Sequence, residues 1–393
     1  MPNSCRPILA FALLMTVACS GTHEEPTKAS TRDSAGVTIT ETPMATWHGS
    51  DGWTVDSTPI LDIGQQDGPD PYLLGQVVGA VRRDDGSIIV VDGDAHQLRL
   101  FDSTGHFVKA RGRKGPGPGE FAYIEQIARC GPNQLWIGTG PRISIWTADL
   151  EFVRELSVRQ NVMWPLICFG GSGLLAKRDL NNMDDPTTNT TRDDSLELIA
   201  LDSAGDSPHD LMSIAVWRRI YLVESKPRVS FPNPFAPMTV LAENGADMIV
   251  GTARTLGFEV FDAQGRLLRI VRGPAGDLAF TAAMRQDYLS SALVGRDKED
   301  REWLNRAGNP IPATMPAYTE IQTDAVGNVW VNRFASPGSS LNRWGVFGRD
   351  DHFLGHVTLP RDLKVFDIGA DYLLGMASDS AGAQHVRLYR LRK

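Results

Sequence analysis

Two glutamates, Glu125 and Glu320, stand near the starts of short strand-like segments that lie far apart in the sequence. A pair of carboxylates at a defined separation supplies the acid and base chemistry of glycosidases and related hydrolases. If these segments line one channel, the two side chains can face each other across it. The alternative is that both are solvated acids of the channel wall. The sequence contains no Gly-x-Ser-x-Gly elbow of a serine hydrolase.

Asp92 and Asp94 are the candidate metal ligands, because they share the segment Asp-Gly-Asp-Ala-His, and carboxylate oxygens suit Ca²⁺. Asp92 is equally placed to cap a loop of a repeated unit, and this alternative stays open. The eight histidines form neither a His-Glu-x-x-His pair nor a spaced cluster. No cofactor is therefore predicted, with Ca²⁺ or Zn²⁺ as the alternatives.

Aromatic and basic residues gather in the segment 212–238, which we interpret as a long loop. Trp, Tyr and Arg contribute much of the binding energy at protein interfaces. The candidate binding residues are Trp164, Trp217, Arg218, Arg219, Tyr221 and Arg228. A loop folded back over its own sheet would use the same residues.

The elements that must position these side chains are repeated β-hairpins. The phrase Phe-Asp-Ser-Thr-Gly at 101–105 returns as Phe-Asp-Ala-Gln-Gly at 261–265, with looser copies elsewhere. Each copy joins two alternating segments through an Asp/Gly turn, which is typical of a hairpin. Hairpins that recur along a chain indicate a propeller, because one unit cannot bury its own apolar face.

Six units can be counted from their second strands, each preceded by a turn rich in Gly, Asn or Asp. These strands are expected at 88–92, 135–139, 174–178, 248–252, 329–333 and 372–376. The sixth unit runs out of chain before a fourth strand, so residues of about 53–63 are expected to complete it. The predicted fold is an all-β, six-bladed propeller of four-stranded blades, closed by an N-terminal strand. A helical insertion is predicted at about 278–306, between blades four and five, and a flexible loop at 179–195.

The N-terminal region has the character of an export signal. Residues 1–18 combine Arg6 with an apolar core and no acidic residue, which is typical of a signal peptide. Met-Thr-Val-Ala-Cys at 15–19 resembles a lipobox and makes Cys19 the candidate lipidation site. Residues 19–52 are interpreted as a polar tether and lead-in, and 53–393 as the propeller. The expected location is the bacterial cell envelope with a membrane anchor, or, alternatively, a soluble periplasmic or secreted form.

Charge and cysteine content narrow the partners. The net charge of −8 and the lack of a basic run with aromatics argue against nucleic acid. Cys130 and Cys168 occupy equivalent places in consecutive units. In an exported protein, the oxidising environment permits a disulfide between them. Equivalent positions in neighbouring blades can nevertheless lie too far apart for such a bond. We expect two inert thiols.

The segment Val90–Asp102, with Gly105 after it, resembles an NHL repeat. The run Gly112–Phe121 is similar to a linker of bacterial six-bladed β-propeller lipoproteins. The resemblance covers nearly all of 53–393 and concerns the fold; it carries little information about activity.

The sequence therefore predicts an exported, lipid-anchored propeller that acts as a binding scaffold for an envelope protein, a peptide or a glycan. The alternative is a metal-dependent propeller hydrolase or lyase with its site in the channel. We expect a non-enzymatic protein.

Overall fold

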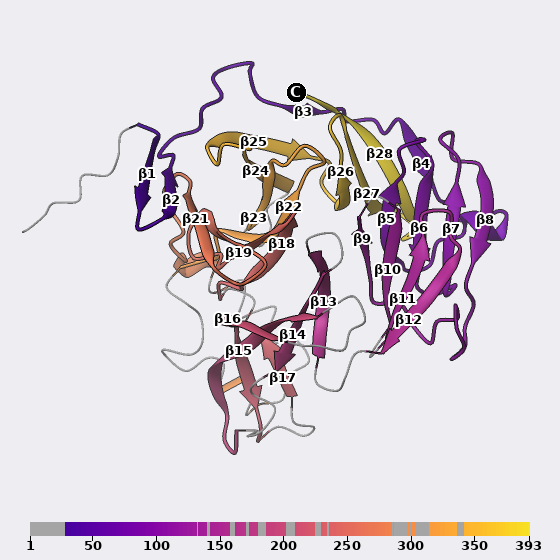
Figure 1. Ribbon diagram of the computed structural model, residues 1–393, viewed down its shortest axis with the longest axis horizontal. Helices are drawn as coiled ribbons and strands as arrows, with labels where there is room; N and C mark the ends of the chain where they lie inside the picture. Colours follow the sequence, from indigo (N-terminus) through magenta and orange to yellow (C-terminus); the bar gives the residue numbers. More distant parts are fainter. Residues whose placement is uncertain are drawn as a thin grey trace, which may run out of the picture.

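The computed structural model describes residues 28–393, except for 132, 140–141, 158–161, 170–172, 180–185, 202–208, 225–228, 234–235, 285, 287–297, 299–300, 303–313 and 336–341. The signal peptide, Cys19 and Arg228 lie outside these described residues. The strands that the structure describes form six sheets, grouped around a common centre (Figure 1). Their pairings are antiparallel, except that β2 pairs in parallel with β21.

The sheets follow the order of the chain. The first contains β5 (Val77–Arg82), β6 (Ile88–Asp92), β7 (Gln97–Phe101) and β8 (Phe107–Arg111). The second contains β9 (Gln126–Cys130), β10 (Gln134–Thr139), β11 (Arg142–Thr147) and β12 (Phe152–Ser157). The third contains β13 (Val162–Phe169), β14 (Gly173–Asp179), β15 (Thr190–Leu201), β16 (His209–Leu222) and β17 (Val229–Pro232).

The other three sheets continue this pattern. The fourth contains β18 (Val240–Asn244), β19 (Asp247–Gly251), β20 (Gly257–Phe261) and β21 (Leu267–Arg272), extended by β2 (Val37–Glu41) and β1 (Ser30–Ser34). The fifth contains β22 (Tyr318–Thr323), β23 (Val329–Arg333), β24 (Asn342–Phe347) and β25 (Phe353–Leu359). The sixth contains β26 (Lys364–Ile368), β27 (Tyr372–Ser378), β28 (Gln384–Arg392), β3 (Thr54–Val55) and β4 (Leu61–Ile63). One 3₁₀ turn, η1 (Asp70–Tyr72), precedes β5.

The repeated Asp/Gly phrase of the sequence is a side-chain-bonded turn. The Asp102 Oδ1 atom accepts hydrogen bonds from the backbone N–H groups of Thr104 and His106, both at 2.9 Å. Gly105 takes the left-handed conformation that closes the turn, with φ of 84°. The Thr104 hydroxyl also donates to Asp102 Oδ1, at 2.7 Å. This bond, followed by the backbone ones, lowers the pKa of Asp102 to about 2. The same arrangement recurs at Asp262, where Gln264 and Arg266 donate.

The apolar core lies between neighbouring sheets. Ile89 and Leu98 of the first sheet pack with Leu135 and Trp146 of the second, all of them buried. The fourth and fifth sheets share a corresponding cluster that contains Phe258, Tyr318, Phe347 and Phe353. Each sheet therefore buries an apolar face against the next one, as the repeat pattern predicted.

The last sheet is completed by the N-terminal segment, as the sequence predicted. β3 pairs with β28 at Val55 and Leu391, and β4 pairs with β28 at Leu61 and Leu388. Arg392 and Asp56 form a bidentate ion pair across this junction, with N–O distances of 2.6 and 2.9 Å. The junction joins the two ends of the sheet array.

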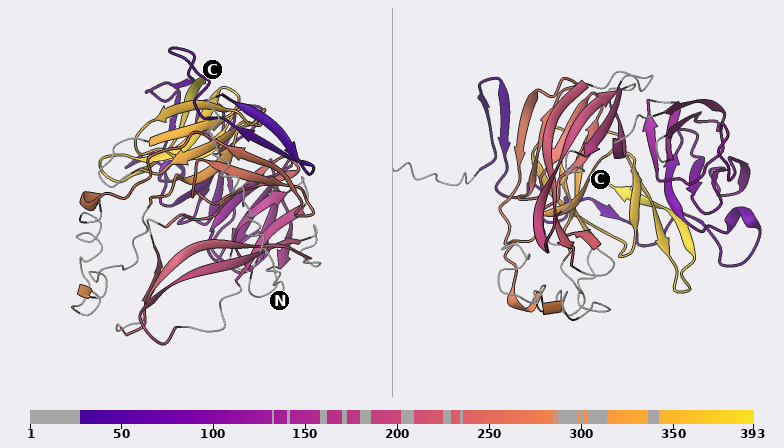
Figure 2. Two further views of the ribbon diagram at one scale, coloured as in Figure 1. Left: turned by 90° about the vertical axis from the view of Figure 1, so that its left-hand side faces the viewer. Right: turned by 90° about the horizontal axis from the view of Figure 1, so that it is seen from below.

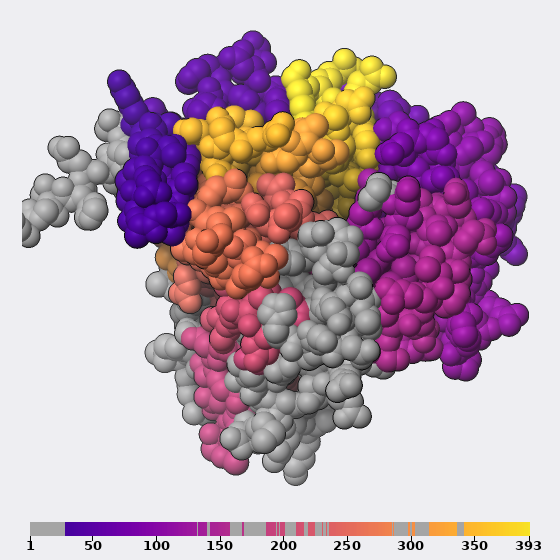
Figure 3. Space-filling view, viewed as in Figure 1, coloured from indigo at the N-terminus to yellow at the C-terminus, as the bar shows by residue number. Residues whose placement is uncertain are grey.

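The lead-in differs from the predicted tether. Residues 30–41 form the β1–β2 hairpin, and β2 pairs in parallel with β21. Figure 3 shows this hairpin in indigo against the orange surface of the fourth sheet. An ion pair between Glu41 and Arg272 and a backbone bond from Thr42 N to Arg272 O (2.8 Å) hold it there. The polar composition of the hairpin suits its exposed place at a sheet edge, which explains why it resembles a linker.

Two further expectations are wrong, and a third is described only in part. The flexible loop predicted at 179–195 is wrong at its second end, because residues from Thr190 onward belong to the long β15–β16 ribbon (Figure 2). The expectation of two free thiols is also wrong: Cys130 and Cys168 form a disulfide with a Cα–Cα distance of 5.2 Å. Of the helical insertion, residues 282–284, 286, 298, 301 and 302 are helical, and most of the rest lies outside the described residues.

Candidate functional site

A channel runs between the first strands of the six sheets. β5, β9, β13, β18 and β22 contact one another in this order, and β26 contacts β5. A hydrogen bond of 3.0 Å from Gln322 Nε2 to the Val365 carbonyl joins β22 to β26. The channel has a volume of about 680 Å³ and is lined by residues of all six strands. Its volume lies within the range of small-ligand sites.

Glu320 is held at one end of the channel. Its Oε1 atom accepts a hydrogen bond of 2.6 Å from Gln322 Nε2. Burial raises the pKa of Glu320 above its ordinary value, whereas hydrogen bonds from Gln322 and Asn332 and the charge of Lys364 act to lower it. Lys364, the first residue of β26, lines the same channel. Glu320 is thus a positioned carboxylate beside a cation.

Glu125 lines this channel as well, directly before β9. The structure therefore brings the two glutamates singled out from the sequence into one cavity. Glu125 is exposed and Glu320 is half-buried, so the two carboxyl groups lie in different environments.

Three charged residues near the other end of the channel were not found from the sequence. Arg129, Glu243 and Asp367 each occupy the next-to-last position of a first strand, in β9, β18 and β26. The shared position in the repeat is the signal that could have found them. Their meeting depends on how the sheets are placed around the channel.

Asp367 is the centre of a hydrogen-bond network. Its Oδ2 atom accepts from the Arg82 backbone N–H at 3.0 Å, from the Tyr372 hydroxyl at 3.1 Å and from Arg129 at 3.4 Å. Arg129 also donates to the Arg82 carbonyl at 2.6 Å. The carboxylate of Asp367 therefore connects the sixth, first and second sheets.

Glu243 has a pKa well above that of an ordinary glutamate. Burial raises its pKa to about 7, against the attraction of Arg129. A carboxyl group with such a pKa exchanges its proton near neutral pH. Ionisable groups of this kind in a cavity are candidates for function.

The charges along the channel are unequal. The described lining residues include five carboxylates (Glu125, Glu243, Glu320, Asp324 and Asp367) but two cations, Arg129 and Lys364. Asp324 is paired with Lys393 at 3.1 Å, and Asp367 with Arg129 at 3.4 Å. Once Glu243 has lost its proton, above a pKa of about 7, carboxylates outnumber cations here by five to two. This excess favours a ligand with positive charge.

The carboxylate of Asp92 forms an ion pair and a hydrogen bond within the first sheet and its loop. Its carboxylate lies 3.2 Å from Arg99, and both side chains are buried, with exposures of 1% and 7%. It also accepts a hydrogen bond of 3.1 Å from the Ala95 N–H. These contacts match the loop-capping alternative. Among the described residues, no three His, Cys, Asp or Glu side chains are arranged to hold a metal ion.

Four of the candidate binding residues, Trp217, Arg218, Arg219 and Tyr221, lie on a strand. The loop interpretation is wrong here, because residues 209–222 form β16 and pair with β15. Tyr221 is buried, accepts a hydrogen bond of 2.9 Å from Arg192, and lies beneath that guanidinium. Arg219 donates to Ser230 of β17 at 2.8 Å. The side chains of Trp164, Trp217 and Arg218 lie outside the described part of the chain.

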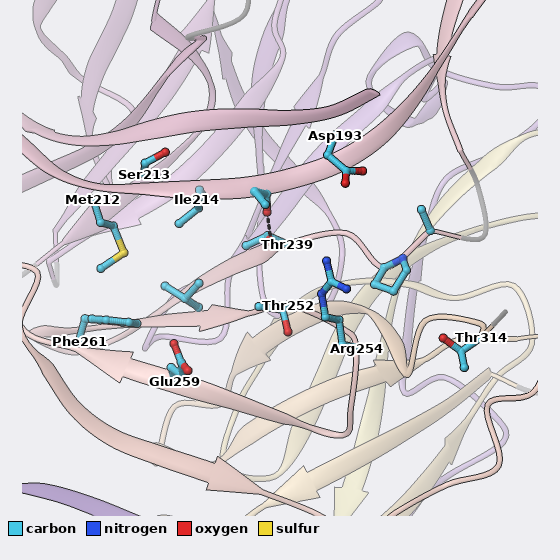
Figure 4. Close-up of a pocket in the computed structure, with 14 residues that line it drawn as sticks. Asp193, Met212, Ser213, Ile214, Thr239, Thr252, Arg254, Glu259, Phe261 and Thr314 are labelled. Atoms are coloured by element: carbon cyan, nitrogen blue, oxygen red, sulfur yellow. Dashed lines mark hydrogen bonds between the residues drawn. The ribbon is translucent and has the colours of Figure 1, made fainter. Parts of the chain in front are cut away.

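A second cavity, the side pocket, opens between the third and fourth sheets (Figure 4). It has a volume of about 510 Å³. Its lining residues are Asp193, Met212, Ser213, Ile214, Ala215, Ala236, Pro237, Thr239, Val250, Thr252, Arg254, Glu259, Phe261 and Thr314. Six of these residues belong to the segment 212–238 that the sequence indicated for binding, but the described candidates Arg219 and Tyr221 are not among them. The pocket itself could not be predicted, because its walls come from different sheets.

Comparisons with known proteins agree with this architecture. The profile of DUF5128, described as a six-bladed β-propeller, matches residues 69–128. No curated protein matches the sequence. A Bacteroides fragilis protein described as exported has a similar structure, with a TM-score of 0.50, 12% identity, and coverage of 90% of this chain and 98% of that one. A DUF4221 family member from Bacteroides vulgatus also has a TM-score of 0.50, with 10% identity and coverage of 87% and 99%.

The arrangement of the sheets and these similarities define an all-β propeller. At such low identity, the likeness concerns the fold alone. No helix among the described residues is long and apolar enough to span a membrane.

Proposed function

We propose that this chain is an exported six-bladed propeller, anchored in the bacterial envelope through lipidated Cys19, that acts as a binding scaffold. The six sheets, joined at their ends by the β3–β28 and β4–β28 pairings, are its six blades. The observation that carries the proposal is the channel, whose lining comes from all six first strands and is rich in carboxylates.

The channel chemistry favours a cationic group of a peptide or envelope protein. Glu320 is oriented by Gln322, and Lys364 is the one cation beside it among the described lining residues at this end. A Lys or Arg side chain entering the channel would find carboxylates from several strands. Charge-assisted hydrogen bonds to such a group are the stronger ones. A glycan would use the same carboxylates as acceptors for its hydroxyls.

Titration of the purified protein with short labelled peptides tests this proposal. An acetylated, amidated Gly-Lys-Gly peptide should bind, and the matching Gly-Glu-Gly peptide should not. Glu320→Gln should weaken the lysine peptide by about tenfold, the effect of losing one hydrogen bond to a charged group. Glu224→Gln, on an exposed residue beyond β16, is the matched control. Equal binding of both peptides, or no effect of Glu320→Gln, would contradict the channel assignment.

The anchor has its own test. The native chain, expressed in a bacterial host with radiolabelled palmitate, should carry label and sediment with membranes. Cys19→Ala should lose the label and appear in the soluble fraction. Label that persists in this variant would exclude Cys19 as the lipidation site.

A second candidate function, catalysis in the channel, is favoured by Glu243. A carboxyl that titrates near neutral pH serves as a general acid or base. A metal-dependent hydrolase or lyase would in addition contain stoichiometric Zn²⁺ or Ca²⁺. Metal analysis of the purified protein, repeated on Glu320→Gln, separates the two functions: bound metal that is lost in the variant would favour catalysis over the scaffold.

A further inference from the structure

The side pocket combines an apolar end with a charged end. Figure 4 shows Met212 and Phe261 together at one end, and Arg254 and Asp193 toward the other, with Glu259 and Thr252 between them. Glu259 and Phe261 are two residues apart on β20, so both side chains project from the same face of that strand. This face turns toward the third sheet.

The loop that carries Arg254 is fixed by the neighbouring sheet. The Tyr318 hydroxyl donates to the Gly257 carbonyl at 2.6 Å and accepts from the Ala253 N–H at 3.2 Å. The Ala317 N–H donates to the Ala253 carbonyl at 2.8 Å. Tyr318 is fully buried, and its pKa is raised by that burial, so the hydroxyl keeps its proton. These bonds fix the backbone on either side of Arg254 before any ligand arrives.

Three charged side chains line this pocket, Asp193, Arg254 and Glu259, and the last two are not used by the fold. Among the described residues, neither Arg254 nor Glu259 has an ion-pair partner. Arg254 is exposed and Glu259 half-buried. A guanidinium binds a carboxylate with paired hydrogen bonds, and a carboxylate binds an ammonium group. Met212, Ile214 and Phe261 supply apolar surface beside them.

We infer that the side pocket binds a zwitterionic ligand with an apolar side chain, the chemistry of a free apolar amino acid or of a short apolar peptide with free ends. The ligand carboxylate would lie on Arg254, its ammonium group on Glu259, and its side chain between Met212 and Phe261. This site is separate from the channel.

Calorimetric titration of the intact protein with L-leucine and with leucyl-leucine tests the inference. At least one should bind saturably, and the tighter of the two identifies the source of the ligand. N-acetyl-leucine lacks the ammonium group and leucine methyl ester lacks the carboxylate, so each should bind at least about tenfold more weakly.

Variants then assign the two contacts. Arg254→Gln should weaken leucine more than it weakens the methyl ester, and Glu259→Gln should weaken leucine more than it weakens N-acetyl-leucine. Arg349→Gln, on an exposed turn of the fifth sheet, is the matched control. The channel variant Glu320→Gln should leave leucine binding unchanged, which separates this site from the proposed scaffold function. No saturable binding of either ligand, or binding indifferent to Arg254→Gln, would overturn the inference.

Discussion

Cys130 and Cys168 are joined by a disulfide that links the first strands of two neighbouring sheets. The two residues are 38 positions apart, and both are buried in a cluster with Trp136, Ile143 and Leu156. The bond therefore fixes the second sheet against the third, where the described contacts between β9 and β13 bring their backbones together.

Replacing both cysteines by serine should lower the free energy of unfolding. For a closed loop of this length, the chain-entropy model gives a loss of about 4 kcal/mol. The measurement is denaturant unfolding of the oxidised native protein and of the double variant. Reductant should destabilise the native protein and leave the double variant unchanged. Identical unfolding midpoints would show that the bond contributes nothing.

The stability of the protein should fall as pH rises through the titration of Glu243. Its folded-state pKa of about 7 lies above the ordinary value of 4.5, so the folded protein holds a proton that the unfolded chain has released. Stability from this group is present below the unfolded pKa and is lost as pH rises toward 7.

Glu243→Gln should remove this dependence. The variant should match the native protein at pH 4 and be the more stable of the two at pH 8, as measured by denaturant unfolding across this range. Glu224→Gln provides the comparison with an exposed glutamate. Parallel stability curves for Glu243→Gln and the native protein would refute the raised pKa.

Removing Asp92 should be strongly destabilising. Its loss leaves the guanidinium of Arg99 buried without its ion-pair partner, which costs about 3–5 kcal/mol. Asp92→Ala and its exposed neighbour variant Asp94→Ala, compared by chemical unfolding, should differ by most of this amount. If added Ca²⁺ raised the melting temperature of the native protein and had no effect on Asp92→Ala, the metal hypothesis would replace the capping one.

Tyr318→Phe should loosen the loop that carries Arg254. The substitution leaves the Ala253 N–H and the Gly257 carbonyl without their buried partner, at a cost of about 1–3 kcal/mol. Hydrogen exchange at the Ala253 amide should accelerate by a corresponding factor. Tyr123→Phe, on an exposed residue, is the control. An unchanged exchange rate at the Ala253 amide would show that the loop does not depend on the hydrogen bonds of the Tyr318 hydroxyl.

Local patterns predicted the second strand of each of the six sheets. β6 and β23 coincide with the predicted second strands, and the other four differ by a residue or two at their ends. These strands are short apolar runs after Asp/Gly turns, and both signals are local. The β1–β2 hairpin and the β15–β16 ribbon escaped prediction, because their polar residues form strands only against a neighbouring edge.

The candidate sites were less accessible to sequence reasoning. Glu125 and Glu320 were found from their places at strand starts. Glu243 and Arg129 could not be related to each other, because their proximity depends on the curvature of the sheet array. The disulfide was missed for the same reason: neighbouring first strands approach closely at the channel, and the spacing of two cysteines in the sequence does not report this distance.

The pairing of β4 with β28 has a consequence for biosynthesis. Ile63 pairs with Val386, so one of the earliest strands must wait until nearly the whole chain has been made before its partner exists. Through most of translation the nascent protein can form individual sheets, but it cannot form the β3–β28 and β4–β28 pairings that complete the last sheet. A chain truncated before residue 384 would thus contain all six first strands that line the channel but lack β28, the strand with which β3 and β4 pair.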